Sequence, residues 1–212
     1  MQVGALPAYE HSLSRGTALH LRHPDGCTVT LDIARWLAPA DAIDLDALDR
    51  SVGLALDVGC GPGRIVAGLA DRECLALGID IAPTAVAMTR ERGLNALRCD
   101  VFAHVPGEGR WSTIVLLDGN IGIGGDPSLL LRRVHELLAP GGRVIIETHP
   151  QCSVDDRQRV RFVVSDQVVG PDFPWAYVGS DAAVDYGRTT GFQTIERWTN
   201  GDRAFVLLER QP

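Results

Sequence analysis

The stretch from Leu54 to Gly63, which reads LALDVGCGPG, most constrains what this chain can fold into. Its first half is an apolar run with one aspartate, which is typical of a strand buried on both faces of a parallel sheet. The glycines at 59, 61 and 63 permit positive φ and let a ligand approach the backbone closely. Pro62 suits the first turn of a following helix. Strand, glycine turn and helix N-terminus together predict a nucleotide site at the carboxyl edge of an α/β sheet.

The spacing of the glycines separates two kinds of nucleotide site. A dinucleotide-binding turn needs glycine or alanine at its third position, but this chain has Arg64 there, or Val66 if the count starts at Gly61. This disfavours a nicotinamide-dependent oxidoreductase. An acidic residue followed by G-x-G-x-G, here Asp57 to Gly63, resembles instead the class I S-adenosylmethionine-dependent methyltransferases. A glycine-rich turn that binds no ligand is the alternative.

Composition narrows the possible partners. The 212 residues suffice for a buried core, and a net charge of −7 without a basic cluster argues against nucleic acid. The five cysteines have no C-x-x-C spacing, so we expect neither zinc nor disulfides, and no metal site. The N-terminus has no basic, apolar leader and no apolar run is long enough to span a membrane, so we expect a cytoplasmic protein without membrane partners.

Residues 1–50 precede the nucleotide strand and are predicted to form an N-terminal cap on the substrate side. Alternation in 18–23 and 27–31, around Pro24-Asp25-Gly26, predicts a β-hairpin, followed by short helices over 32–37 and 44–50. A cap that only shields the sheet is the alternative. Candidate pocket walls in this cap are His11, Arg15, Arg35 and Trp36.

Residues 51–212 are predicted to form the S-adenosylmethionine-binding domain, within one structural domain overall. The resemblance covers 54–210 and includes a second hallmark, the L-x-P-G-G turn at 138–142 between a helix and a strand. It implies an α/β, Rossmann-like fold: a seven-stranded, mostly parallel sheet with helices on both faces and an antiparallel last strand. We expect the last two strands to form a hairpin with a type I′ turn at Asn200-Gly201.

The resemblance also implies which residues bind S-adenosylmethionine and its product, S-adenosylhomocysteine. Asp80 ends the second predicted strand, where a carboxylate holds the ribose hydroxyls; capping of the helix near Pro83 is the alternative. Asp100 is expected to accept from the adenine amino group, with Val101 and Phe102 against the ring. The full set expected at the cofactor is Asp57, Gly59, Cys60, Gly61, Gly63, Asp80, Ile81, Asp100, Val101, Phe102, Asp118 and Gly119.

Candidate catalytic residues follow the fourth and fifth predicted strands. His149 and Glu147 are candidates for the base or for substrate contact, and Asn120 for positioning. The segment Asp118-Gly-Asn-Ile lacks the D/N-P-P-Y/F pattern of enzymes that methylate base or amide nitrogens. We expect two loops, 118–125 and 170–177, to order together over the ligands, with Trp175 and Tyr177 as pocket walls.

These features predict a methyltransferase that transfers a methyl group from S-adenosylmethionine to an oxygen or nitrogen of a small-molecule metabolite. A catalytically silent S-adenosylmethionine-binding sensor or partner subunit is the alternative, because no residue after Asp118 identifies itself as catalytic. The acceptor and the oligomeric state are not indicated.

Overall fold

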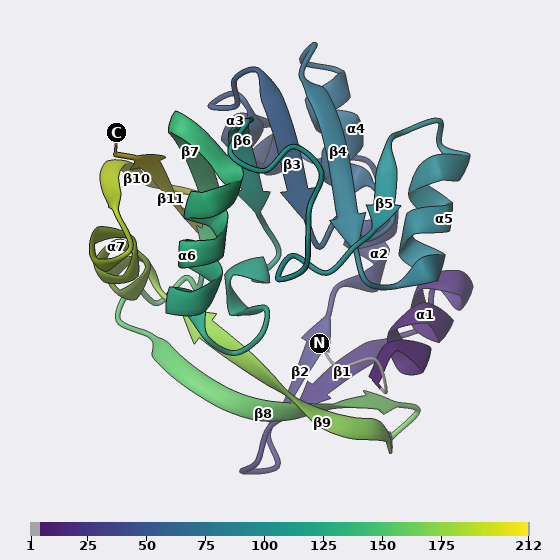
Figure 1. The fold of residues 1–212 in the computed structure, drawn as a ribbon. Helices are drawn as coiled ribbons and strands as arrows, with labels where there is room; N and C mark the ends of the chain where they lie inside the picture. Colours follow the sequence, from purple (N-terminus) through teal and green to yellow (C-terminus); the bar gives the residue numbers. More distant parts are fainter. Residues whose placement is uncertain (1–4, 212) are drawn as a thin grey trace.

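The computed structural model describes residues 5–211, which form two β-sheets and the helices around them (Figure 1). The larger sheet has seven strands. In spatial order they are β10 (Phe192–Asn200), β11 (Arg203–Arg210), β7 (Leu138–Thr148), β6 (Trp111–Leu116), β3 (Leu54–Val58), β4 (Leu75–Asp80) and β5 (Ala96–Arg98). The strands from β7 to β5 are parallel to one another, and β11 is antiparallel to β7. The predicted fold class is confirmed.

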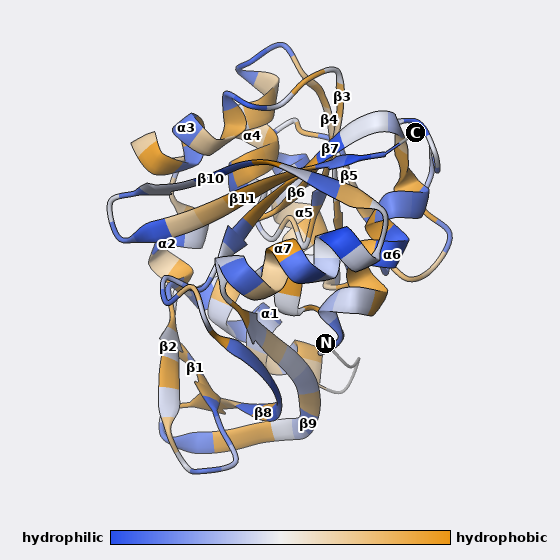
Figure 2. Ribbon diagram, turned by 90° about the vertical axis from the view of Figure 1, so that its left-hand side faces the viewer, coloured by the Kyte–Doolittle hydropathy of each residue, from blue (hydrophilic) through white to orange (hydrophobic). Residues whose placement is uncertain are grey.

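Helices cover both faces of this sheet, because its central strands are apolar on both sides. Alternate residues point to opposite faces of a strand. Ala55, Val115 and Ile145 therefore pack with α3 (Ala42–Leu48) and α4 (Arg64–Ala70), whereas Leu56 and Ile114 pack with α6 (Pro127–Leu137) and α7 (Ser180–Thr189). Figure 2 shows the central strands as mostly hydrophobic between more mixed helices. The remaining helices are α1 (Leu6–Arg15), α2 (Ile33–Leu37), α5 (Pro83–Glu91) and the 3-10 helix η2 (Asn120–Gly122).

A second, four-stranded sheet lies below the carboxyl edge of the main sheet in the view of Figure 1. Its order is β2 (Thr28–Leu31), β1 (Leu19–Arg22), β8 (Asp155–Val164) and β9 (Gln167–Val178), all antiparallel. We call it the lid sheet. The predicted N-terminal hairpin is present, but it pairs with β8, which begins only at Asp155. The lid sheet packs on α1 and α5 through a separate apolar cluster that includes Leu13, Leu21 and Phe162.

The prediction of a loop over 170–177 is wrong, because these residues belong to β9. Pro174 and Trp175 pair with Arg159 and Gln158 of β8. β9 is an edge strand of the lid sheet, and edge strands are where a sheet tolerates proline. Residues 170–177 are therefore part of the lid sheet.

Two local turns also differ from the prediction. The β10–β11 hairpin turns at Gly201-Asp202, between the paired Asn200 and Arg203. Of the two turn residues only Gly201 has positive φ (60°), so the turn is not type I′. Helix α4 begins at Arg64, with Gly63 as its N-cap, so Pro62 lies before the helix. No helix in residues 5–211 is long and apolar enough to cross a membrane.

Candidate functional site

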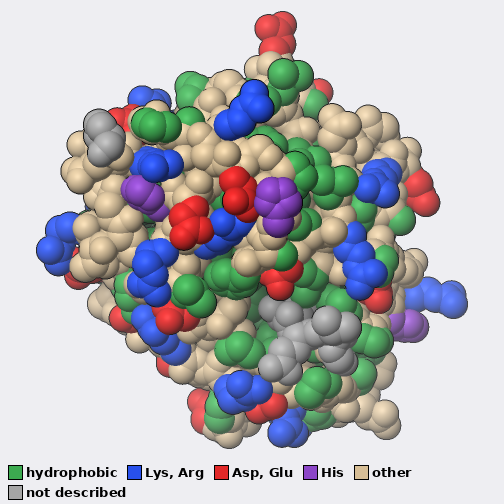
Figure 3. All heavy atoms as spheres, viewed as in Figure 1, with side chains coloured by type: hydrophobic (Ala, Val, Ile, Leu, Met, Phe, Trp, Pro, Cys, Tyr) green, Lys and Arg blue, Asp and Glu red, His purple; other side chains and the backbone are tan. Residues whose placement is uncertain are grey.

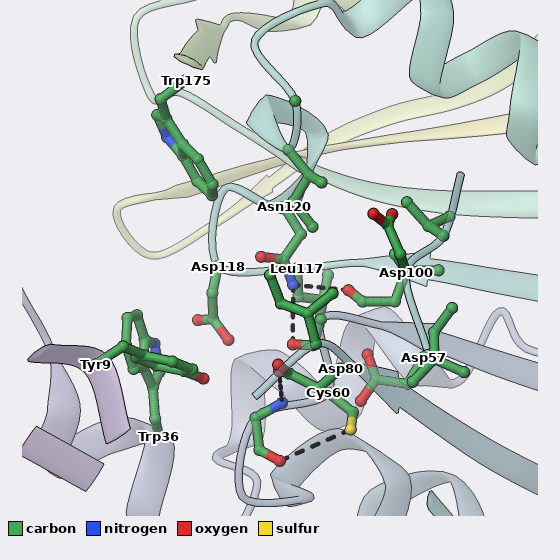
Figure 4. A pocket seen from close by; sticks show the side chains of 18 of the residues that line it. Tyr9, Trp36, Asp57, Cys60, Asp80, Asp100, Leu117, Asp118, Asn120 and Trp175 are labelled. Atoms are coloured by element: carbon green, nitrogen blue, oxygen red, sulfur yellow. Dashed lines mark hydrogen bonds between the residues drawn. The ribbon is translucent and has the colours of Figure 1, made fainter. Parts of the chain in front are cut away.

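A cavity of about 320 Å³ separates the carboxyl edge of the main sheet from the lid sheet. The glycine turn after β3 and the ends of β4, β5 and β6 form one wall. The lid sheet, with α1 and α2, forms the other. Figure 4 shows Tyr9, Trp36 and Trp175 on the lid side, with Asp57 and Asp100 opposite them. The cavity thus lies where parallel α/β sheets bind ligands.

The glycine turn is held in place from several sides. Gly59, Gly61 and Gly63 all have positive φ (74°, 52° and 87°), which side-chain-bearing residues rarely adopt. The Gly61 N–H donates to Asp80 Oδ2 at 3.0 Å, and the Thr89 hydroxyl donates to the Gly61 carbonyl at 2.9 Å. A Cβ on Gly63 would lie 2.7 Å from the Thr89 side chain. The turn is therefore preformed, with Gly59 and Gly61 on the cavity.

Four aspartates line the cavity: Asp57, Asp80, Asp100 and Asp118. Asp57 is only 2% exposed, and its Oδ2 is buried without a hydrogen-bond partner among the described residues. Burial, with the nearby Asp118 and Asp80 charges, raises the pKa of Asp57 well above its ordinary value. Asp80 accepts from the Ala82 and Gly61 N–H groups, but burial outweighs these bonds and raises its pKa as well. The site is short of positive charge.

A buried ion-pair network lies behind the cavity. Asp44, fully buried on α3, accepts from Arg35 at 3.0 Å and Arg203 at 2.9 Å, and it also binds Arg64. Arg64 in turn reaches Asp118 at 2.5 Å. Burial lowers the pKa of Arg64 and raises that of Asp118. The network therefore ties the N-terminal helices to the end of β6, where Asp118 has a φ of 55°.

Asn120, a predicted positioning residue, lines the cavity from η2. Its Nδ2 donates to the carbonyls of Val58 at 2.8 Å and Gly59 at 3.2 Å. A Cβ on Gly59 would come within 2.8 Å of this amide. Asn120 thus connects the segment after β6 to the glycine turn.

The structure places most of the residues expected at the cofactor around this one cavity. Gly63 and Gly119 are the exceptions, since neither is among its lining residues. The lining residues from that prediction are Asp57, Gly59, Cys60, Gly61, Asp80, Ile81, Asp100, Val101, Phe102 and Asp118.

The two residues proposed as bases do not line the cavity. Glu147 accepts from Arg203 through both oxygens at 2.7 Å and from the Asp118 N–H at 2.8 Å, so it serves the buried network. The Nδ1 of His149 accepts from the Gln151 N–H at 3.1 Å in the turn after β7. The sequence predicts both residues beside the substrate only because they lie at the end of the fifth predicted strand. No histidine is among the described residues that line the cavity.

Of the residues predicted as pocket walls, some line the cavity and the others do not. Trp36 and Trp175 line the cavity, whereas Arg35 lies behind it, paired with Asp118 at 3.2 Å. His11 and Arg15 are exposed on α1. Tyr177 stacks on His23, with ring centroids 5.2 Å apart and its hydroxyl 3.0 Å from the His23 Nε2, outside the cavity.

Sequence reasoning missed several lining residues, of which Tyr9 is the most notable. Its buried side chain lies among the cavity carboxylates, and burial together with the Asp80 charge raises its pKa well above the ordinary value. Leu21, Leu31, Phe162 and Phe173 line the lid side. Apolar alternation in 18–23 had indicated a buried face for Leu21, but nothing local indicated what that face would cover.

Comparison with known proteins agrees with this geometry. Residues 55–142 match a model of the methyltransferase domain. The fold and the cavity define a Rossmann-like domain with a ligand site at the carboxyl edge of its sheet, and over the matched residues the chain is similar to S-adenosylmethionine-dependent methyltransferases.

Individual relatives are more distant. A ubiquinone biosynthesis O-methyltransferase from Pseudomonas paraeruginosa is 29% identical over 112 residues, 48% of each chain, so the match spans about half the length of this relative. A methyltransferase from Bacteroides fragilis, crystallised with S-adenosyl-L-homocysteine, superposes with a TM-score of 0.81 at 20% identity, covering 100% of this chain and 98% of that one. A sugar N-methyltransferase from Streptoalloteichus has a TM-score of 0.58 at 16% identity, covering 80% and 84%. The two structures share the fold with this chain.

Proposed function

We propose that this chain transfers a methyl group from S-adenosylmethionine to an oxygen or nitrogen of a small-molecule acceptor. The observation that carries this proposal is the cavity lined by four aspartates at the carboxyl edge of the main sheet, between a preformed glycine turn and the lid sheet. S-adenosylmethionine has a sulfonium, an ammonium and a carboxylate, and thus a net positive charge. A cavity with four aspartates and one arginine, already paired, fits such a ligand.

Individual residues fit the parts of this cofactor. Asp80, at the end of β4, is suited to the ribose hydroxyls, and Asp100, after β5, to the adenine amino group. Val101 and Phe102 supply apolar surface for the ring. The unpartnered Oδ2 of Asp57 is suited to the ammonium group, because a buried carboxylate gains most from a cationic donor. The names of the relatives, which are O- and N-methyltransferases, support transfer to either atom.

Binding and turnover test the proposal separately. Calorimetry should show binding of S-adenosylmethionine and S-adenosylhomocysteine, and none of NADH. Preference for NADH would refute the cofactor assignment. Release of S-adenosylhomocysteine in the presence of a metabolite panel should then show transfer. Tight cofactor binding without turnover on any acceptor would favour the silent sensor or partner subunit.

A further inference from the structure

We propose that the acceptor is a small lipophilic amine, bound between the lid sheet and Asp118 and methylated on nitrogen. This inference rests on the proposed function, because it concerns the part of the same cavity that the cofactor leaves open. Three independent features of the cavity carry it: its charge, its aromatic walls and the absence of a suitable base among the described lining residues.

The charge of the cavity excludes anionic acceptors. Asp57, Asp80 and Asp100 form no ion pair with any described residue. Arg64 is the only cationic residue among those described in the lining, and it is bound to Asp44 and Asp118. Because the cofactor contributes a single net positive charge, the filled site still has an excess of carboxylates. A carboxylate or phosphate on the acceptor would find no counter-ion here, whereas an ammonium would.

The lid side of the cavity is built from aromatic rings set at steep angles. Tyr9 and Trp36 meet edge to face, with centroids 6.1 Å apart and planes at 74°, and Phe173 and Trp175 do the same at 6.5 Å and 89°. The two pairs come from different elements, α1 with α2 and β9, and all four rings line the cavity; Figure 4 shows Tyr9, Trp36 and Trp175 on the same side of it. Perpendicular aromatic faces beside a carboxylate are the surroundings that favour an organic cation.

The titratable groups that line the cavity favour methyl transfer to nitrogen over transfer to oxygen. A hydroxyl acceptor must lose its proton during transfer, and the lining offers for this only carboxylates, Tyr9 and Cys60. Burial raises the pKa of Tyr9 and of Cys60, so both remain protonated near neutral pH. A carboxylate is too weak a base to deprotonate an aliphatic hydroxyl, which is far less acidic than a phenol with its pKa of about 10. Glu147 and His149 lie outside the lining.

An amine needs no base in the transfer step itself. The bound ammonium first releases one proton to solvent. The nitrogen lone pair then forms the N–C bond while the methyl–sulfur bond breaks, and the electron pair of that bond stays on sulfur. The products are an N-methylammonium ion and the neutral thioether S-adenosylhomocysteine. The positive charge therefore moves from the cofactor to the acceptor and stays beside the carboxylates.

Matched acceptor analogues test the proposal on the full chain. With S-adenosylhomocysteine bound, calorimetry at pH 7.5 would compare 2-phenylethylamine, 2-phenylethanol and phenylacetate. The amine should bind about tenfold more tightly than the alcohol, and phenylacetate should not bind. Equal affinity for amine and alcohol, binding of phenylacetate, or binding of none of the three would overturn the proposal. Failure of S-adenosylhomocysteine to bind would instead overturn the proposed function.

A substitution at Trp175 isolates the aromatic contribution. Trp175→Leu keeps apolar volume but removes the π face, so it should weaken amine binding about tenfold and leave alcohol binding within about twofold. Trp175→Phe, which keeps a π face, should restore most of the amine affinity. Trp198→Leu is the control, since Trp198 stacks on Phe205 away from the cavity. Equal losses for amine and alcohol in Trp175→Leu would mean that this wall is only apolar, and the proposal would fall.

Discussion

Removing the carboxylate of Asp44 should destabilise the protein more than removing any surface carboxylate of the same helix region. Asp44 is fully buried and binds the guanidinium groups of Arg35, Arg64 and Arg203, as well as the Asp41 N–H at 3.0 Å. Arg64 is only 2% exposed, so Asp44→Ala leaves a buried cation with Asp118 as its remaining partner. Breaking a buried pair from one side costs about 3–5 kcal/mol.

Asp49→Ala is the matched control. Asp49 follows α3 and pairs with Arg72 at 2.6 Å, but it is 65% exposed, so its loss should cost no more than about 1 kcal/mol. Urea unfolding of the two variants measures the difference. With a slope of about 2 kcal/mol per molar urea, Asp44→Ala should lower the midpoint by about 1.5–2.5 M.

Two further variants separate the loss of the Asp44 charge from the loss of its side-chain shape. Asp44→Asn keeps the shape of the side chain and should still be strongly destabilised, because the charge is what the arginines need. The double variant Asp44→Ala/Arg64→Met removes both charges of one buried pair and should recover part of the loss. If Asp44→Ala unfolds within about 1 kcal/mol of Asp49→Ala, the network contributes no more than a surface pair and the reasoning is refuted.

Three other variants probe the cavity. Asp80→Ala should weaken S-adenosylhomocysteine binding by about 1.5–3 kcal/mol in calorimetry, whereas the exposed Asp71→Ala should not; unchanged affinity in a folded Asp80 variant would remove Asp80 from the site. Gly61→Val should abolish cofactor binding, because φ is 52° and the new Cβ would lie 3.3 Å from the Tyr9 hydroxyl. Gly93→Val is the control: Gly93 has a φ of 77° and no neighbour within 4 Å, so this variant introduces backbone strain alone and should still bind the cofactor. The native pKa of Asp57 is raised, so the folded state binds more protons than the unfolded state and stability falls as pH rises above about 4. Asp57→Asn should therefore be more stable than the wild type at pH 7, with a smaller gain at pH 4, and should bind S-adenosylmethionine less tightly; a variant that loses stability at pH 7 would contradict this.

On the face seen in Figure 3, arginine and acidic side chains are interspersed and do not gather into a patch of one sign. Two of the uncompensated carboxylates, Asp57 and Asp80, are buried, and desolvation there makes a cationic ligand most favourable.

The sequence alone determined the main sheet and the position of its ligand edge. Glycines at 59, 61 and 63 after an apolar strand leave few conformations open, and the alternation of apolar strands with capped helices specifies a parallel sheet. Asp80 could be placed because the carboxyl ends of parallel strands meet at one edge, and Asp100 was placed through the resemblance to the methyltransferases. These signals are local, or they follow from general rules of connection, so a single sequence carries them.

Only the tertiary structure decided what covers that edge and which polar groups are already paired within the protein. The lid sheet joins residues 19–31 to 155–178, and no local pattern encodes that pairing. Glu147 and Asp57 are both acidic residues of buried strands, yet one is bound by Arg203 and the other has an unpartnered oxygen. Whether a carboxylate is free for a ligand depends on which arginine lies within 3 Å of it, and folding brings those arginines from up to 159 residues away.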